Sequence, residues 1–176
     1  SQLMRNANTE YLNGNFLRAI KFAEDAISEN PKAPEPYNLL GMIAEEREQF
    51  SNAVLFLSKA AELSTDSTEL WMECARISKE MGKLSSAASY LKKAVKSNQN
   101  ETTALIELYD LVSNMYSDNR TLLWTLKKLA KRLPAEGKYA YELSTFQYQV
   151  GDTLGAIETL RNSIDAQIQS RVPISM

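Results

Sequence analysis

The sequence has 176 residues, of which 44% are hydrophobic and 24% are charged, a composition typical of a globular chain with a substantial core. Its formal net charge of −2 argues against nucleic-acid binding through an overall positive charge. The chain has no histidine, one cysteine (Cys74) and no glycine-rich phosphate-binding motif, which excludes histidine-based catalytic triads and an internal disulfide.

A 34-residue period runs through the first part of the chain. Leu3, Tyr37 and Trp71 lie 34 residues apart, and small residues follow each of them at the same offsets. The period predicts helix-turn-helix units at about 1–33, 34–67 and 68–101. A degenerate fourth unit with one extra residue follows at 102–136, and a fifth at 137–169. The last residues, 170–176, are expected to form a tail within a longer protein.

Small side chains recur where the helices of such units must cross closely, because a larger side chain would push the helix axes apart. Twelve residues fit this role: Ala7, Ala19, Ala26, Gly41, Ala53, Ala60, Ala75, Ala87, Ala94, Ser144, Ala156 and Ser163. Turns are predicted at Gly14, Gly82 and Gly151. Asp66, with Glu69 three residues later, predicts a capping box at the start of the third unit.

The succession of aromatic, leucine, small and proline positions at this period resembles the tetratricopeptide repeat family. The resemblance covers residues 1 to about 169. It implies an all-α fold, a right-handed superhelical solenoid of about five tetratricopeptide helix-turn-helix repeats. In this family the first helix of each repeat lines a concave groove, and the second helix lies on the convex back.

The family pattern implies that twelve residues of this chain form a partner-binding groove, with Glu35 and Glu69 on the same face. The twelve are Asn8, Tyr11, Asn38, Met42, Glu45, Met72, Arg76, Lys79, Ile106, Asp110, Tyr141 and Tyr148. Acidic, apolar and aromatic side chains are mixed among them. Such a surface suits an extended or helical peptide with apolar anchors and some basic residues.

Family members that bind chaperones grip a C-terminal carboxylate with lysine, asparagine and arginine side chains. The matching positions here are Met4, Asn8, Leu39, Glu69 and Glu73. Two glutamates would repel a carboxylate. The sequence therefore excludes a chaperone adaptor of that kind.

Residues 33–96 also resemble the tetratricopeptide subunits of general transcription factor IIIC. The likeness lies in Ala33-Pro34-Glu35-Pro36-Tyr37, Thr68-Glu69-Leu70-Trp71 and Lys93-Ala94-Val95-Lys96. It departs at 62–66, and the fourth and fifth repeats match only as generic repeats. The resemblance implies a nuclear scaffold for RNA polymerase III transcription, with TFIIIB and other factor IIIC subunits as protein partners.

Two other functions remain open at this point. One is a tetratricopeptide adaptor in another large nuclear or cytoplasmic complex, such as a cell-cycle ligase or an RNA-processing machine. The other is an enzyme that uses groove carboxylates, although the sequence offers no nucleophile–base constellation for it. We expect no catalytic residues, no cofactor, no metal and no membrane-spanning segment, since no run of 18 apolar residues occurs.

Two basic clusters are expected on second helices, and no aromatic stacking platform for bases is expected beside them. They are Lys92, Lys93 and Lys96, and Lys127, Lys128, Lys131 and Arg132. Lysine is common near helix C-termini, where it complements the helix dipole, so direct DNA contact is not expected.

The final predicted helix, 153–169, has apolar residues at spacings of three and four. Ile157, Leu160, Ile164 and Ile168 form this stripe. Part of it should pack on the preceding helix, and the remainder should be exposed, covered by further repeats or covered by a second copy. Self-association through this helix is therefore expected.

Overall fold

The computed structural model describes residues 1–98, 102–115 and 119–171 of the chain. These residues form ten α-helices and no β-strand, so the prediction of an all-α fold made of helix pairs is confirmed. The chain divides into two compact units, Ser1–Glu101 and Thr102–Met176, called unit 1 and unit 2 below. Residues 172–176 of the predicted tail lie outside the described residues.

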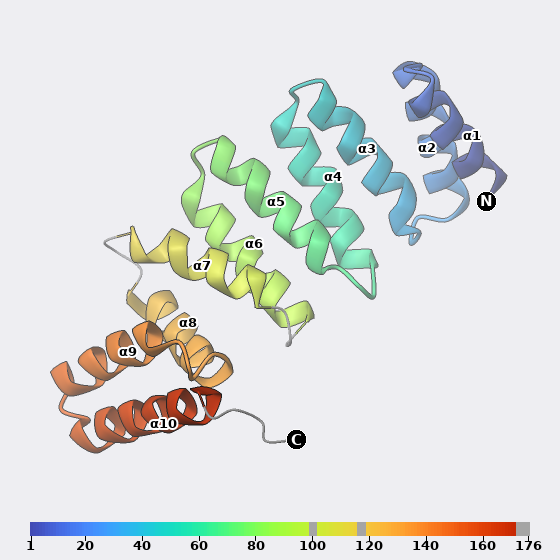
Figure 1. The fold of residues 1–176 in the computed structure, drawn as a ribbon. Coiled ribbons are helices and arrows are strands. Elements are labelled where there is room, and N and C mark those ends of the chain that lie inside the picture. Colours follow the sequence, from blue (N-terminus) through green and yellow to red (C-terminus); the bar gives the residue numbers. More distant parts are fainter. Residues whose placement is uncertain (99–101, 116–118, 172–176) are drawn as a thin grey trace, which may run out of the picture. The chain divides into compact units, whose positions relative to one another are not determined.

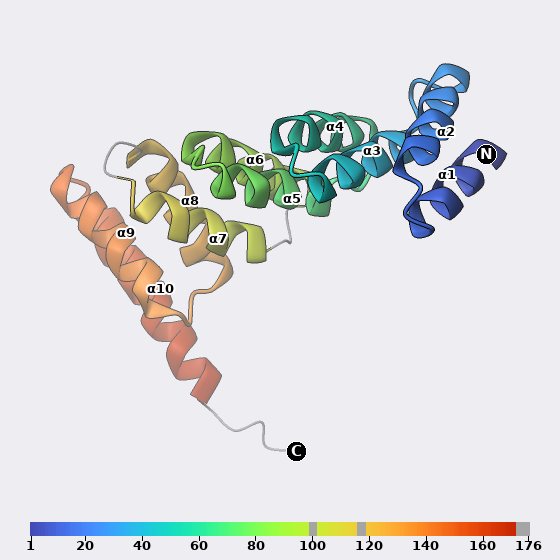
Figure 2. The same ribbon diagram turned by 90° about the horizontal axis from the view of Figure 1, so that it is seen from above.

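Unit 1 is a stack of three helix pairs (Figure 1). The helices are α1 (Gln2–Leu12), α2 (Phe16–Glu29), α3 (Pro34–Glu46), α4 (Phe50–Leu63), α5 (Thr68–Glu80) and α6 (Leu84–Ser97). Each pair packs on the next, with α2 against α3 and α4 against α5. Within this unit, Figure 2 shows α1, α3 and α5 along one side and α2, α4 and α6 along the other. The first helices therefore share one face.

Unit 2 contains two helix pairs. They are α7 (Thr103–Ser113) with α8 (Asn119–Arg132), and α9 (Gly137–Gln149) with α10 (Thr153–Arg171). Each helix packs on the one that follows it. Nine of these ten helices fall inside the repeat ranges expected from the sequence, and α10 continues two residues into the predicted tail. The exact limits of the five repeats remain a prediction from the sequence.

All twelve small residues of the 34-residue pattern are buried. Ala7, Ala53 and Ala87 have no exposed surface at all. Gly41 shows why a small residue is needed, because a Cβ atom there would lie 2.6 Å from Cγ of Leu57 on α4. Close helix contacts within each pair therefore fix the residue type at these positions.

The glycines at the three predicted turns have a left-handed backbone. The φ angles of Gly14, Gly82 and Gly151 are 74°, 71° and 85°. Glu48 lies midway between Gly14 and Gly82 in the 34-residue register and also has a positive φ, of 57°. A residue with a Cβ is disfavoured in this conformation. The α3–α4 turn therefore carries a local strain that the other turns of unit 1 avoid.

Replacing Glu48 by glycine should raise the free energy of unfolding by about 0.5–1 kcal/mol, because relief of the left-handed strain exceeds the added freedom of the unfolded chain. Thermal and urea denaturation would measure the change. Gly82→Ala is the matched control and should lower the free energy of unfolding. Nothing lies within 4 Å of a Cβ atom at this position, so the substitution adds only backbone strain. Loss of stability in Glu48→Gly would contradict this reading of the turn.

The predicted capping box at Asp66 and Glu69 is wrong. Helix α5 begins at Thr68, and Ser67 occupies the N-cap without a side-chain capping hydrogen bond. The Ser64 hydroxyl donates a 2.7 Å hydrogen bond to the carbonyl of Asp66, which shapes the preceding loop. Asp66 consequently lies one residue too early to cap the helix.

The apolar stripe of α10 lies on the exposed face of unit 2. Ile157, Leu160, Ile164 and Ile168 are between 38% and 58% exposed. Small residues are buried on the opposite side of α10, where the Ser163 hydroxyl donates a 2.7 Å hydrogen bond to the carbonyl of Pro134. The helix thus packs into unit 2 through small side chains and presents large aliphatic ones outward.

Candidate functional site

The twelve predicted groove residues all lie on the first helices of the five pairs, and none is fully buried. Unit 1 carries eight of them, and unit 2 carries Ile106, Asp110, Tyr141 and Tyr148. The residues of unit 1 are Asn8 and Tyr11 on α1, Asn38, Met42 and Glu45 on α3, and Met72, Arg76 and Lys79 on α5.

A pocket of about 480 Å³ lies between α3, α4 and α5 of unit 1. We call it the α3–α5 pocket. Three of the twelve predicted groove residues line this pocket, together with five residues that were not predicted. The lining residues are Asn38, Met42, Glu45, Leu57, Asp66, Glu69, Leu70 and Glu73.

The α3–α5 pocket combines apolar side chains with polar groups that have no partner. Met42 is 39% exposed, whereas Leu57 is only 2% exposed. Within the described parts of the chain, the carboxylates of Asp66 and Glu69 and the amide of Asn38 make no hydrogen bond or ion pair. Groups of this kind remain available to a ligand.

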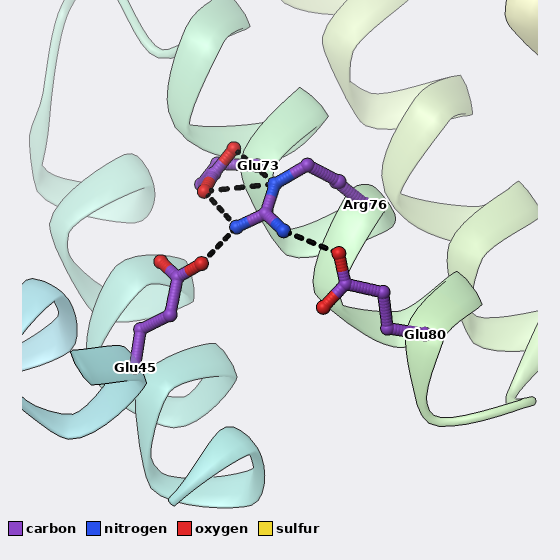
Figure 3. Close-up of polar contacts among 4 residues, drawn as sticks. All are labelled: Glu45, Glu73, Arg76 and Glu80. Carbon is purple, nitrogen blue, oxygen red and sulfur yellow. Dashed lines mark hydrogen bonds and ion pairs between the residues drawn. The ribbon is translucent and has the colours of Figure 1, made fainter. Parts of the chain in front are cut away.

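Arg76 forms ion pairs with three glutamates, two of which line the α3–α5 pocket (Figure 3). Its Nε donates to both carboxylate oxygens of Glu73 at 3.1 and 3.0 Å. Its Nη1 donates to Glu80 at 2.5 Å, and its Nη2 donates to Glu45 on α3. The contact with Glu45 joins two successive helix pairs, so Arg76 stabilises the wall of the pocket. It also partly neutralises the negative charge of the pocket.

The hydrogen bonds from Arg76 hold the pKa of the Glu73 carboxyl below its ordinary value of 4.5. The same contacts raise the pKa of the Arg76 guanidinium. Glu73 is therefore ionised at neutral pH and poorly suited to act as a general acid, which needs a raised pKa. This geometry gives the enzyme alternative no support.

Because its pKa is lower in the folded protein, Glu73 should contribute stability that is present above about pH 4.5 and is lost as the pH falls through the folded-state value. Replacing Arg76 by methionine should remove this acid-dependent contribution, of about 0.5 kcal/mol after solvent screening. Urea denaturation between pH 7 and pH 3 would measure it. Arg18→Met, at the exposed 3.8 Å pair with Glu10, is the control and should leave the pH slope unchanged.

Two tyrosines also connect successive first helices. The Tyr11 hydroxyl donates to Glu46 on α3, and this contact raises the pKa of Tyr11 to about 12. In unit 2, Tyr109 on α7 donates a 2.6 Å hydrogen bond to Glu142 on α9. Tyr11 therefore has a structural partner, whereas Tyr141 and Tyr148 are predominantly exposed.

One lysine of each basic cluster lies next to an aromatic ring. The Nζ atom of Lys93 lies 4.1 Å from the ring centre of Trp71, which stacks on Tyr90 at 5.8 Å. Lys128 covers Trp124 at 4.9 Å. Trp71 is buried, so the Trp71–Tyr90 pair is part of the helix packing and does not offer an open face to a base.

Other site types have no counterpart in the described part of the chain. No three of its cysteine, aspartate and glutamate residues are grouped so that they could hold a metal ion. None of its helices is both long and apolar enough to cross a membrane. Burial raises the pKa of the Cys74 thiol to about 12, which makes this thiol unreactive.

Comparison with known proteins agrees with this architecture. Residues 68–101 match the tetratricopeptide repeat model. The human protein general transcription factor 3C polypeptide 3 is 26% identical over 163 residues, which cover 90% of this chain. The chain spans only 18% of the length of that relative.

Two solved structures have similar folds. YrrB, a TPR protein with an unusual peptide-binding site, superposes with a TM-score of 0.55 at 20% identity, covering 94% of this chain and 84% of YrrB. MamA superposes with a TM-score of 0.53 at 16% identity, covering 93% of this chain and 95% of MamA. The helix pairs, the buried small residues at a 34-residue period and the matched repeat lead to one assignment. The chain has the all-α solenoid fold of tetratricopeptide repeat proteins, and its residues 68–101 match the model of that repeat.

Proposed function

We propose that this chain is a protein-interaction scaffold of the RNA polymerase III transcription machinery, as part of a factor IIIC subunit that contacts the initiation factor TFIIIB. The general role rests on the fold, since stacked repeats present extended surfaces that bind other proteins. The specific role is supported by the similarity to general transcription factor 3C polypeptide 3, which extends over 90% of this chain. A nuclear location follows from this proposal.

The α3–α5 pocket is the observation that carries the binding role. It places apolar and unpaired polar groups together between α3, α4 and α5, as a surface for a protein segment requires. We assign the remaining groove residues to the same role, including exposed Tyr141 and Tyr148 on α9, because exposed aromatic side chains are effective anchors at interfaces.

Affinity capture from nuclear extract with the 176-residue chain, followed by mass spectrometry, tests the proposal. Recovery of factor IIIC and TFIIIB subunits is expected. Met72→Ala with Tyr141→Ala should reduce that recovery, whereas Lys127→Glu with Lys128→Glu should leave it nearly intact. Recovery of a different complex would favour the adaptor alternative, and loss only in the lysine variant would move the site to the second helices.

We also assign self-association to the outward face of α10, whose four aliphatic side chains are exposed. Sedimentation velocity over a concentration series should show a rising sedimentation coefficient. Ile164→Glu or Ile168→Glu should abolish the rise, because a charge at the centre of an apolar contact is costly to desolvate. Concentration-independent sedimentation of the unaltered chain would refute the assignment.

A further inference from the structure

The α3–α5 pocket is strongly negative. Four carboxylates line it, those of Glu45, Asp66, Glu69 and Glu73, and the guanidinium of Arg76 contacts only two of them. Glu80, which also binds Arg76, adds a fifth carboxylate beside the pocket. Asp66 and Glu69 keep no partner among the residues that the structure describes. The local charge therefore favours a cationic ligand group.

The pocket is more than a cluster of acids, because its floor is apolar. Met42, Leu57 and Leu70 contribute to its lining. Lysine and arginine side chains have this same division, with an aliphatic stem and a charged end. The stem can cover the floor while the charged end reaches Asp66 and Glu69 at the α4–α5 loop and the start of α5.

The Asn38 amide adds a group that can both donate and accept a hydrogen bond at the pocket. The backbone of an extended segment offers donors and acceptors in the same way. Nucleic acid does not fit this site, because its phosphates would meet four carboxylates. A protein segment with basic residues satisfies the charge, the apolar floor and the amide together.

We propose that the α3–α5 pocket binds a lysine or arginine side chain of an extended protein segment, with an aliphatic or aromatic residue of that segment packed beside it on Met42. The proposal rests on the proposed function only in its general form, that the chain binds proteins. The pocket selects basic residues because their positive charge neutralises the carboxylates of Asp66 and Glu69.

Selection of random twelve-residue peptides displayed on phage, with the whole 176-residue chain immobilised, tests this inference. Enrichment of lysine or arginine next to an apolar residue is expected. Asp66→Asn with Glu69→Gln should then weaken binding of the selected peptide by about tenfold, since two partly exposed charge contacts are lost. The affinity of the unaltered chain should also fall more steeply with salt than that of the double variant.

Glu24→Gln with Asp25→Asn on α2 is the matched control, because it makes the same change of charge at exposed positions outside the pocket. It should leave the peptide affinity unchanged, and circular dichroism should show that both double variants keep the helical fold. Peptides without basic enrichment, no enrichment at all, or equal affinity in the Asp66–Glu69 variant would overturn the proposal. Failure to capture factor IIIC subunits would overturn the transcription role and leave this result unaffected.

Discussion

Replacing Leu57 by alanine should lower the free energy of unfolding by about 2–5 kcal/mol. Leu57 is 2% exposed on α4 and lies so close to α3 that only glycine fits at position 41 opposite it. Its truncation removes buried apolar contacts and leaves a cavity between two helices that the Gly41 backbone cannot fill. Urea denaturation followed by circular dichroism would measure the loss.

Leu55→Ala makes the same change two residues earlier on the same helix. Leu55 is 63% exposed, so its truncation should change the free energy of unfolding by less than about 0.5 kcal/mol. Equal effects of the two variants would show that α4 does not present Leu57 to α3. Because Leu57 also lines the α3–α5 pocket, its truncation should lower the affinity for a basic segment as well as the stability of the fold.

The sequence predicted the helix pairs because their packing depends on a repeated constraint. Each pair needs small side chains at the same crossing points, so alanine or glycine recurs at positions such as 7, 41 and 75. A 34-residue register of this kind is visible without any structure. The turns at Gly14 and Gly82 were also predictable, because glycine readily adopts the left-handed conformation that both residues have in the structure.

The α3–α5 pocket was only partly predictable. Its α3 members follow from the repeat register, which places Asn38, Met42 and Glu45 on the face of the first helices. Asp66 comes from a loop, and the sequence suggested a helix cap for it. The start of α5 depends on hydrogen bonds in that loop, such as the one from Ser64, and single-sequence patterns do not determine these.

The cluster around Arg76 was also beyond the sequence pattern. Spacings of three and four on α5 make contacts with Glu73 and Glu80 natural for a helix. The contact with Glu45 is different, because it joins residues 31 apart and depends on how two helix pairs stack. Glu48 likewise adopts the left-handed conformation that favours glycine. The α3–α4 turn has a positive φ like the equivalent turns within the other helix pairs of unit 1, although its residue is not glycine.

Ala53→Leu and Ala87→Leu should each lower the free energy of unfolding by about 1–3 kcal/mol. Both alanines are fully buried, 34 residues apart, on α4 and α6. A leucine at either position adds three carbon atoms where two helices already touch, so the helices must separate or the side chain must leave its preferred rotamer. Because the two positions are equivalent in the repeat, the two losses should be similar.

Ser51→Leu and Ser85→Leu are the matched controls for these two variants. They also lie 34 residues apart, one turn or less before the alanines on the same helices, and both are exposed. A leucine there meets solvent, so the free energy of unfolding should change by less than about 0.5 kcal/mol. If the buried and exposed variants melted alike, the small residues would not be the contacts that set the 34-residue period. A large loss of stability at positions 53 and 87 alone would show that the 34-residue period arises from the close crossing of the helices. The solvent-facing positions have the same spacing, but leucine there would not destabilise the fold.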